Sequence, residues 1–525
     1  MTVSSVLRAV ALTMFPFAAL AQGGTPDASF GTGGLVLSAL GTSARAAAVA
    51  LDASGRAVVV GSVSVTGQNR NFGVARYTGA GALDATFGTN GVVLTDFDGD
   101  RDEARGVLIQ PDGKIVVVGE SVLPNQGSRV ALARYLPTGA LDLTFDTDGK
   151  VTTDATLDQD MGSSVARQAD GKLVVTAYQF GFATDFCTLR YTVAGALDLT
   201  FDGDGKAFVS VAPGNDGAMR VIVQADQKLV VAGFGATTGN ISSNDAAFVR
   251  YLSTGALDPA FGTAGIAVRP MALGSDDRVY DVVQQPDGKL VAAGYALLGS
   301  TAVVTAQRLL PTGAADLGFG TNGRAQLPLS ARATLAEAVA LQADGKIVVA
   351  GSRVGAQNGE LLLVRFLPTG ALDAAFGLGG SVSTPGPGAT MLGARGLAIQ
   401  PNGRLLTAGE GSLNATAAFA VARYLAGPLT GLSEGEVSEN LHLFPNPAVN
   451  TAPLTLALDL PRDTPLAVRL YDGTGRLVRE LHPTTELLAG PHRLPLDVTA
   501  LAAGCYWVGV ETRAGRQLRR LVLTP

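Results

Sequence analysis

One pattern recurs seven times along this chain, and it constrains the fold more than any other feature. The phenylalanine of a Leu-Asp-x-x-Phe-Gly-x-x-Gly element returns at intervals of 56 to 60 residues, with small departures. Its seven positions are Phe30, Phe87, Phe145, Phe201, Phe261, Phe319 and Phe376. A Gln-Pro/Ala-Asp-Gly-Lys element lies midway in each unit, and an Ala-Arg-Tyr element closes it. Repeats of this length are typical of solenoids, propellers and arrays of small units.

The second unit shows the local structure to expect. Four short runs rich in β-branched residues predict strands at 91–94, 106–110, 114–119 and 130–135. Pro111-Asp112-Gly113 joins the middle two runs and predicts a tight type I′ hairpin turn, because Asp and Gly tolerate positive φ. No apolar stripe with the helical period is present. The sequence therefore predicts an all-β fold, a seven-bladed β-propeller whose four-stranded blades have about 57 residues each.

Two other architectures fit the repeat less well. The coils of a β-solenoid are usually shorter and do not need two tight turns each. An open array is disfavoured because a single four-stranded sheet cannot bury both of its faces. The sequence leaves the closure of the ring open, since the first unit begins at Pro26-Asp27 and the last ends at Tyr424.

Composition limits the partners. The chain has 525 residues, of which 47% are hydrophobic and 16% charged, enough for large buried cores. Its net charge is −6 and it has no basic run, which argues against a nucleic-acid partner. The two cysteines, Cys187 and Cys505, lie far apart in the chain and do not suggest a disulfide framework.

The first 21 residues have the features of a secretory signal peptide. Arg8 precedes a short apolar stretch from Ala9 to Leu20, and Ala19-Leu20-Ala21 has the small-x-small form of a cleavage site. No other segment approaches the ~20 apolar residues that a membrane-spanning helix needs. We therefore expect Sec export to the periplasm, a mature chain without a transmembrane anchor, and a propeller spanning residues 22–427.

The repeated elements resemble those of the delta-60 repeat family over residues 26–427. Gln227 stands in place of the turn glycine in the fourth unit, and Leu309 in place of the closing tyrosine in the fifth. The resemblance implies a bacterial secreted or surface protein, and it brings no established catalytic activity or ligand.

The C-terminal region differs from the repeats. A linker at 428–440 leads to residues 441–525, where apolar residues alternate between glycine turns and predict a small β-sandwich. Phe444-Pro445-Asn446-Pro447, the Tyr471–Arg476 turn and the Ala503–Val510 strand resemble the type A C-terminal sorting domain of the type IX secretion system. The resemblance implies recognition by that machinery through residues 441–525. It also implies secretion or display on the outer surface of a bacterium of the Bacteroidetes kind. A carbohydrate-binding or immunoglobulin-like module is the alternative.

The propeller offers little for catalysis. All three histidines, His442, His482 and His492, lie in the C-terminal region, which excludes Ser-His-Asp triads and His-based metal sites from residues 22–427. We predict no catalytic residue and no cofactor. One acidic run could hold calcium, which prefers several carboxylate oxygens from one flexible loop. Its members are Asp96, Asp98, Asp100, Asp102 and Glu103.

The repeated Arg and Asp are interpreted as turn caps or ion pairs between blades, since a group present in every unit is usually structural. In a four-stranded antiparallel blade, the repeated short turns share one end of the ring and the variable connections share the other. The variable connections are 96–104, 121–128, 234–245, 272–277 and 383–394. Variable loops on a rigid scaffold usually carry binding. The sequence therefore favours a non-catalytic module for binding, adhesion or structure, with a surface glycan or protein as its ligand. A polysaccharide-active hydrolase or lyase that uses propeller carboxylates is the alternative, and a passive spacer is the third possibility.

Overall fold

The structure is a computed structural model that describes residues 23–427 and 441–524, apart from short gaps. The gaps in the first region are 67–68, 98–100, 125–126, 157–158, 181–183, 237–243, 273–275, 329, 331, 355–358, 387–391 and 415. Those in the second region are 447, 450–453, 461–462, 472–476, 502–503 and 513–514. The predicted signal peptide and the linker at 428–440 lie outside the described residues.

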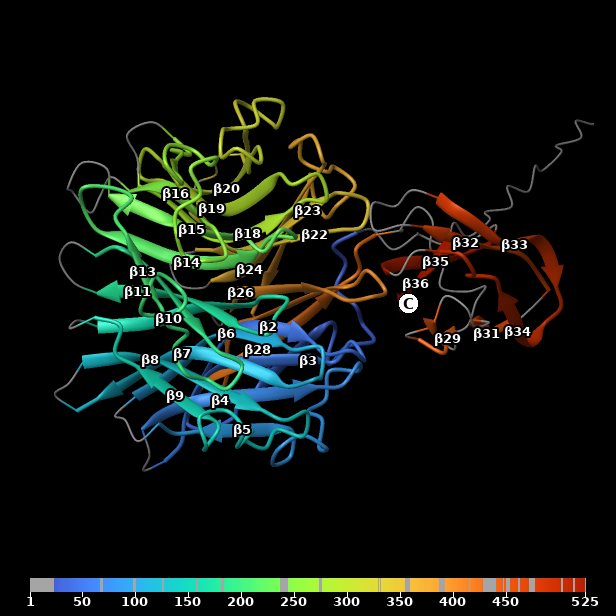
Figure 1. Ribbon diagram of the computed structural model, residues 1–525, viewed down its shortest axis with the longest axis horizontal. Coiled ribbons are helices and arrows are strands. Elements are labelled where there is room, and N and C mark those ends of the chain that lie inside the picture. The colour runs from blue at the N-terminus through green and yellow to red at the C-terminus, as the bar shows by residue number, and fades with distance from the viewer. Residues whose placement is uncertain are drawn as a thin grey trace, which may run out of the picture.

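Within residues 23–427, the described chain forms five four-stranded antiparallel sheets and one eight-stranded sheet (Figure 1). A single parallel pair, Arg70 with Arg101, joins the two antiparallel halves of the larger sheet, so we number seven four-stranded units as blades 1 to 7. The inner strands of blades 1 to 7 are β2 (Ser43–Leu51), β6 (Arg101–Ile109), β10 (Gln159–Arg167), β14 (Asp216–Val223), β18 (Asp277–Gln284), β22 (Thr334–Leu341) and β26 (Leu392–Ile399). The second strands are β3 (Ala57–Ser64), β7 (Ile115–Leu123), β11 (Leu173–Phe180), β15 (Leu229–Ala236), β19 (Leu290–Leu298), β23 (Ile347–Arg353) and β27 (Leu405–Leu413).

The third strands are β4 (Arg70–Tyr77), β8 (Gly127–Tyr135), β12 (Phe186–Tyr191), β16 (Asn244–Tyr251), β20 (Thr301–Leu309), β24 (Glu360–Phe366) and β28 (Thr416–Tyr424). The outer strands are β5 (Val92–Thr95), β9 (Lys150–Thr153), β13 (Lys206–Val209), β17 (Ile266–Val268), β21 (Arg324–Gln326), β25 (Ser381–Pro385) and, in blade 7, β1 (Leu35–Ser38). Each inner strand packs against the inner strands of both neighbouring blades, and these contacts close a ring. The predicted all-β propeller is confirmed.

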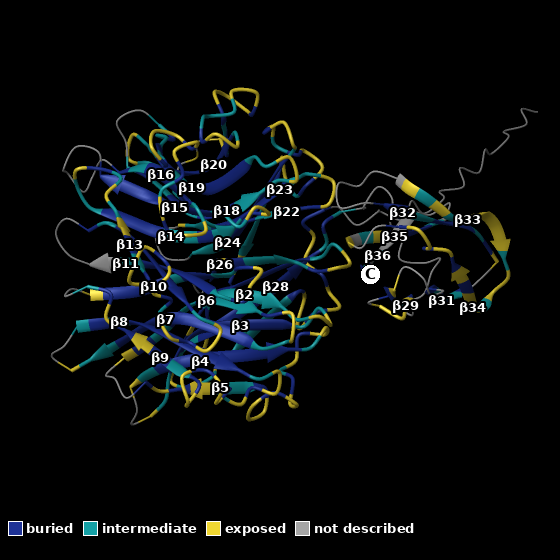
Figure 2. Cartoon of the chain, in the orientation of Figure 1, coloured by how far each residue is buried: buried dark blue, intermediate teal, exposed yellow. Residues whose placement is uncertain are grey.

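The hydrophobic cores lie between neighbouring blades, because each sheet carries apolar side chains on both of its faces. The second strands show this most clearly: β7 and β15 are buried along most of their length (Figure 2). In one core, Val58 and Val60 of blade 1 pack with Val117 of blade 2. A blade therefore completes its burial only through its neighbours, which is why the fold needs the whole ring.

The sequence unit and the blade differ by one strand, which corrects the prediction that the four strands of a unit form one blade. The first run of the second unit is β5, and it pairs with β4, with Val92 opposite Ala75. The chain then crosses to the inner strand β6 of the next blade. The Leu-Asp-x-x-Phe element is thus a turn within a blade rather than a boundary between blades.

The ring closes because the first strand of the repeat region joins the last blade. Strand β1 pairs antiparallel with β28, with Leu35 opposite Ala422, and completes blade 7. The turn below it is assembled from two separate segments. Leu425 donates its N–H to the carbonyl of Thr25 at 2.8 Å, and Gly24 donates to the carbonyl of Leu425 at 2.6 Å.

The predicted type I′ turn between the first two strands is wrong. In blade 2, Gln110 and Lys114 are joined by a backbone hydrogen bond of 2.8 Å, so the loop is longer than two residues. Gly113 alone among the turn residues has a positive φ, +82°. Pro111 explains the difference, because its ring fixes φ near −65°, which suits a type I turn followed by a glycine in the left-handed region.

Residues 441–524 form two sheets that share one core. The smaller sheet holds β29 (His442–Phe444), β31 (Leu454–Leu460) and β34 (Gly490–Leu496). The larger holds β30 (Ala448–Val449), β36 (Gly515–Thr524), β35 (Gly504–Thr512), β32 (Thr464–Tyr471) and β33 (Leu477–Leu487). Leu456 of the first sheet and Val468 of the second belong to the same buried cluster. Within the described residues of the whole chain, no helix has the length and apolarity to cross a membrane.

Candidate functional site

The three repeated sequence elements meet at one point in every blade. In blade 2, the Arg134 guanidinium donates to the Asp142 carboxylate at 2.7 Å and lies over the Phe145 ring, 4.5 Å from its centroid. Lys114 of the turn pairs with the same carboxylate at 3.0 Å. We call this set a node. It recurs in all seven blades, with arginine in place of lysine in blades 1 and 7.

Each node also ties its blade to the next one. Arg134 donates another N–H to the carbonyl of Val193, in a turn of blade 3, at 2.6 Å. Burial alone would raise the pKa of Asp142, but hydrogen bonds from Thr144 and Lys114, together with the charge of Arg134, hold that pKa well below its usual range. The repeated Arg and Asp are therefore structural, as the sequence indicated, and they leave no free charge for a ligand.

The acidic run proposed as a calcium site is described only in part. Asp98 and Asp100 lie outside the described residues. Asp102 is fully buried, and its Oδ2 accepts the backbone N–H of Phe97 at 2.9 Å. The charge of Asp96 adds to the effect of burial in raising the pKa of Asp102.

Glu103 follows Asp102 in strand β6, so the two side chains point to opposite faces. Glu103 pairs with the guanidinium groups of Arg70 and Arg105. In the part of the chain that the structure describes, no three acidic, histidine or cysteine side chains are grouped as metal ligands. Because two of the five proposed ligands are not described, the calcium site stays a prediction.

Asp102 belongs to a recurring device. A fully buried aspartate stands near the start of the inner strand in blades 2 to 5, and it accepts backbone N–H groups of the incoming connection. In blade 4, Asp216 Oδ2 accepts the N–H of Val211 at 2.7 Å and that of Ala212 at 3.2 Å. Burial raises the pKa of Asp216 to about 7, against the opposing effect of these hydrogen bonds.

The raised pKa of Asp216 predicts a pH effect on stability. Its charged form is disfavoured in the fold, so its contribution is full below the unfolded pKa and is lost as pH rises through about 7. We expect Asp216→Asn, which keeps an oxygen acceptor, to exceed the wild type in free energy of unfolding by roughly 1–3 kcal/mol at pH 8. The two should converge near pH 4. Urea unfolding at both pH values tests this, and an equal difference at both would contradict it.

The inner strands, unlike the nodes, carry partly exposed polar, charged and aromatic side chains. Every inner strand has a β-bulge at the same register, and the extra residue is re-aimed relative to its neighbours. In blades 1 to 7 these residues are Ala47, Arg105, Ser163, Met219, Tyr280, Glu337 and Arg395. Three consecutive blades, 5 to 7, thus present a phenol, a carboxylate and a guanidinium around the ring axis.

A second row lies two residues closer to the end of the ring that carries the variable connections. It consists of an inner-strand residue and its cross-strand partner, such as Arg278 with Tyr295 in blade 5. In blade 4 the pair is Gly217 with Phe234. A Cβ at Gly217 would lie 2.6 Å from Phe234 and 2.8 Å from Tyr178, so glycine is what lets these two rings pack.

We call these two rows together the axial arc, which crosses six blades, and ring contacts and ion pairs link several of its neighbouring members. Its members are Tyr178, Phe234, Arg278, Tyr280, Tyr295, Glu337, Arg395, Glu410 and Arg45. The Tyr178 and Phe234 rings are 6.0 Å apart, and the Arg278 guanidinium lies 4.7 Å from the Phe234 centroid. The Tyr280 and Tyr295 rings are 6.2 Å apart.

Asp276 fixes the middle of the axial arc. Its carboxylate accepts the Tyr295 hydroxyl at 3.0 Å, the Arg278 Nε at 3.3 Å and the Asn244 amide at 2.6 Å. These bonds set the directions of an aromatic ring and a guanidinium before any ligand arrives. Such preorganisation lowers the entropic cost of binding.

Two glutamates lie in the last part of the arc. Glu337 pairs with Arg395 at 3.6 Å, and Glu410 pairs with Arg45 at 3.8 Å. Burial raises the pKa of Glu337; the Arg395 charge opposes the shift and the Glu410 charge adds to it. The pKa of Tyr280 is raised to about 12, first by burial and then by the Glu337 charge. A partly buried carboxyl with a raised pKa is suited to general acid–base chemistry.

Sequence reasoning missed the arc, although a signal was present. The bulge residue always stands five positions before the first residue of the turn element, as Tyr280 stands before Gln285. Along the inner strands, this column changes from alanine in blade 1 to arginine, tyrosine and glutamate in blades 2, 5 and 6. The described parts of the predicted variable connections lie at the same end of the ring, and Phe234 opens one of them.

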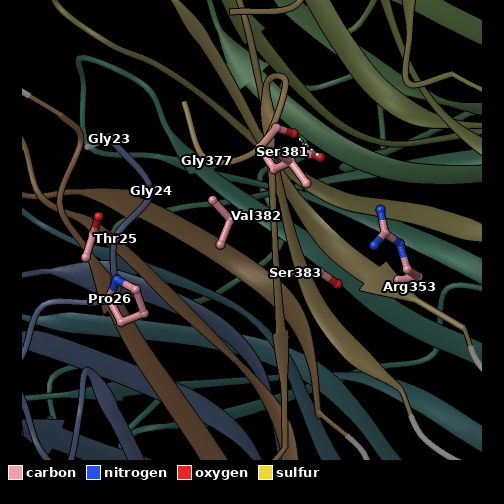
Figure 3. A pocket seen from close by; sticks show the side chains of 10 residues that line it. Gly23, Gly24, Thr25, Pro26, Arg353, Gly377, Ser381, Val382 and Ser383 are labelled. Atoms are coloured by element: carbon pink, nitrogen blue, oxygen red, sulfur yellow. Dashed lines mark hydrogen bonds between the residues drawn. The ribbon is translucent and has the colours of Figure 1, made fainter. Parts of the chain in front are cut away.

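One hollow lies elsewhere, between the N-terminal segment and β25, with a volume of about 440 Å³ (Figure 3). Glycines and small side chains line it, and Arg353 is the one charged residue in its lining. No convergent set of polar groups faces it. We interpret this hollow as part of the seam where the ring closes.

Comparison with known families accounts for the repeats. A family described as a domain of unknown function (DUF5122) β-propeller matches residues 53–87, 110–145, 168–201, 224–261, 285–319 and 342–376. Six of the seven blades thus contain a DUF5122 β-propeller repeat. Each matched segment of the DUF5122 family runs from the first turn of a blade to its phenylalanine, so it contains one complete node.

The seventh node is not covered by a matched segment, because its residues come from both ends of the repeat region. Arg423 and Arg404 come from the end of the repeat region, whereas Asp27 and Phe30 come from its start. Arg423 donates to Asp27 at 2.7 Å across the closure. The structure completes in space a repeat that the sequence divides.

The C-terminal sandwich matches a secretion system C-terminal sorting domain over residues 442–524. This match confirms the resemblance to sorting domains. It also supports export of the chain, since such a domain directs secretion.

No curated protein matches this sequence significantly. Several solved structures match over about three quarters of this chain. A protein of unknown function from Dyadobacter fermentans is 12% identical, with 74% of this chain and 97% of that chain covered, and a TM-score of 0.38. Polysaccharide lyase Uly1 is 12% identical, with 72% and 89% covered and a TM-score of 0.41. An ulvan lyase of family PL25 is 10% identical, with 78% and 94% covered and a TM-score of 0.33. At these TM-scores the likenesses carry no functional assignment.

Proposed function

We propose that this chain is a secreted or cell-surface binding module whose ligand site is the axial arc and the variable connections around it. After Sec export through the periplasm, residues 441–525 would address it to the type IX secretion system of a Bacteroidetes-like bacterium. The sorting-domain match supports this route, and the signal features at 1–21 agree with it. The module serves adhesion or recognition outside the cell.

The distribution of side chains between the two ends of the ring carries this proposal. At the short-turn end, the repeated arginines and aspartates of the nodes are paired and mostly buried, as with Arg134 and Asp142. At the other end, the arc holds partly exposed tyrosines and arginines, and hydrogen bonds to Asp276 fix the directions of Tyr295 and Arg278. Aromatic and arginine side chains at a rigid, partly covered surface are typical of binding sites.

A binding panel tests the proposal with the full chain against polysaccharides, matrix proteins and bacterial cell surfaces, with calcium and with chelator. We expect selective binding that Tyr280→Ala weakens by at least about tenfold, because it removes a ring from the arc. Leu378→Ala, a change at an exposed apolar residue of the short-turn end, is the matched control and should bind normally. Absence of binding to every surface would favour the passive spacer, and equal loss in both variants would place the site elsewhere.

A second function is favoured by the pair Glu337 and Glu410. A carboxyl with a raised pKa near another carboxylate is what a polysaccharide hydrolase or lyase requires. If the chain is such an enzyme, Glu337→Gln should abolish the release of short sugars while leaving the unfolding transition intact. If Glu337→Gln still releases short sugars, Glu337 is not a catalytic residue.

A further inference from the structure

The last part of the axial arc presents cations to solvent and covers its anions. The side chains of Arg45 and Arg395 are 57% and 50% exposed, whereas those of Glu410 and Glu337 are 18% and 20% exposed. A molecule that approaches this part of the ring therefore meets guanidinium groups first. A less exposed carboxylate lies near each of them, that of Glu410 beside Arg45 and that of Glu337 beside Arg395.

These guanidinium groups also keep donors available. The pairs Arg45–Glu410 and Arg395–Glu337 are 3.8 and 3.6 Å long, beyond hydrogen-bonding distance. In the nodes, by contrast, Arg134 binds its carboxylate at 2.7 Å. The planar fork of arginine matches a carboxylate or sulfate in two parallel hydrogen bonds. The two exposed arginines of the arc are thus arranged to receive an anionic group.

An aromatic surface adjoins the cations. Tyr280 lies in the blade next to Glu337, whose charge acts on it, and its ring is 6.2 Å from that of Tyr295. The Tyr295 hydroxyl is held by Asp276, which fixes the orientation of the ring. Sugar rings bind aromatic faces through their apolar C–H surface, and a rigid ring makes this contact at a low entropic cost.

The net charge of the chain does not by itself favour an anionic ligand. The chain carries a net charge of −6, so long-range attraction does not draw polyanions to its surface. An acidic ligand that binds must do so through local contacts with the guanidinium groups. A polyanion without sugar rings would bind the guanidinium groups but would make little contact with the tyrosine rings.

We infer that the axial arc binds an acidic polysaccharide, with the carboxylate or sulfate of one sugar on Arg395 and Arg45 and an adjoining sugar ring against Tyr280 and Tyr295. This inference rests on the proposed function and names its ligand class. The ligand spans blades 5, 6, 7 and 1 across the ring axis.

Affinity electrophoresis of the full chain tests the inference in gels that contain polygalacturonate, dextran sulfate or neutral dextran. Retardation is expected in one or both acidic gels and not in neutral dextran, and it should weaken with added salt. Stronger retardation by polygalacturonate would indicate a preference for carboxylate groups, and stronger retardation by dextran sulfate a preference for sulfate groups. We expect Arg395→Ala to weaken binding at least about tenfold, and Arg395→Lys to weaken it less, since lysine keeps the charge and loses the fork.

Arg332→Ala is the matched control, because Arg332 is a partly exposed arginine that pairs with Glu360 in blade 6, outside the arc. It should migrate as the wild type does in every gel. Equal loss in Arg332→Ala and Arg395→Ala, or equal retardation in neutral dextran, would overturn the inference. So would competition by polyphosphate as strong as that by the acidic polysaccharide. If neither acidic polymer binds while another panel ligand binds in a Tyr280-dependent manner, the inference fails and the proposed function stands.

Discussion

Removal of residues 23–38 is expected to open the ring and to lower the free energy of unfolding by about 5–10 kcal/mol. The segment contributes strand β1, whose backbone pairs with β28 and whose Leu35 and Leu37 pack against the blade 7 core. It also contributes Asp27, the buried partner of Arg423, which deletion would leave without its carboxylate. Losses of strand pairing, apolar burial and a buried charge partner act together at this seam.

Urea unfolding of chains that begin at residue 23 and at residue 39 measures this effect. A chain that ends at residue 427 is the control, because it loses a larger segment without touching the ring, and its ring transition should be unchanged. If the chain that begins at 39 unfolds within about 1 kcal/mol of the longer one, closure through β1 is wrong.

Arg134→Ala is expected to cost about 3–5 kcal/mol of stability, the range for breaking a buried ion pair. Arg134 is 3% exposed and joins Asp142, the Phe145 ring and the carbonyl of Val193 in the next blade. Its removal leaves Asp142 with Lys114 as its one remaining ion-pair partner within the node and takes a donor from the Val193 carbonyl. The loss thus falls on two blades.

Arg134→Lys separates charge from geometry at the same node. Lysine restores one ion pair but neither the planar stack on Phe145 nor the link to blade 3, so an intermediate loss is expected. Arg332→Ala, in a partly exposed pair that joins no two blades, should cost less than Arg134→Ala, about 1 kcal/mol. Thermal or urea unfolding measures all three, and equal effects of Arg134→Ala and Arg332→Ala would contradict the structural role of the nodes.

The overall architecture could be predicted because the repeated residues are those that hold it. Arg134, Asp142 and Phe145 are conspicuous in sequence since each blade needs the same contacts in the same order. The blade boundary could not be read from these markers, because the chain leaves one sheet between Thr95 and Arg101, where no repeated residue stands. Pairing, and not the motif, decides where a blade ends.

The two ends of the repeat region carry a sequence signal for the closure of the ring. The first Leu-Asp-like element, at Asp27, has no Ala-Arg-Tyr before it, and the last Ala-Arg-Tyr, at Arg423, has no Asp after it. Each lacks the partner that every other unit contains, and the structure joins the two. The turn type was missed for a local reason, since Pro111 fixes its own φ and only Gly113 enters the left-handed region.

The candidate site was the least predictable part. Its residues do not repeat, and they are brought together by ring geometry, as Glu337 of blade 6 meets Arg395 of blade 7. A bulge at one fixed register aims them toward the axis, and bulges leave little trace in a sequence. The acidic run at 96–103 was easier to see because it is contiguous.

Hydrogen exchange of the full chain, alone and with whichever ligand of the panel binds it, tests the central claim most directly. We expect slower exchange in the inner strands β18, β22 and β26, in β2, and in the connections at that end of the ring. The nodes and the short turns should exchange as they do in the free protein. Protection confined to the short-turn end, or to residues 441–524, would contradict a binding module whose site is the axial arc.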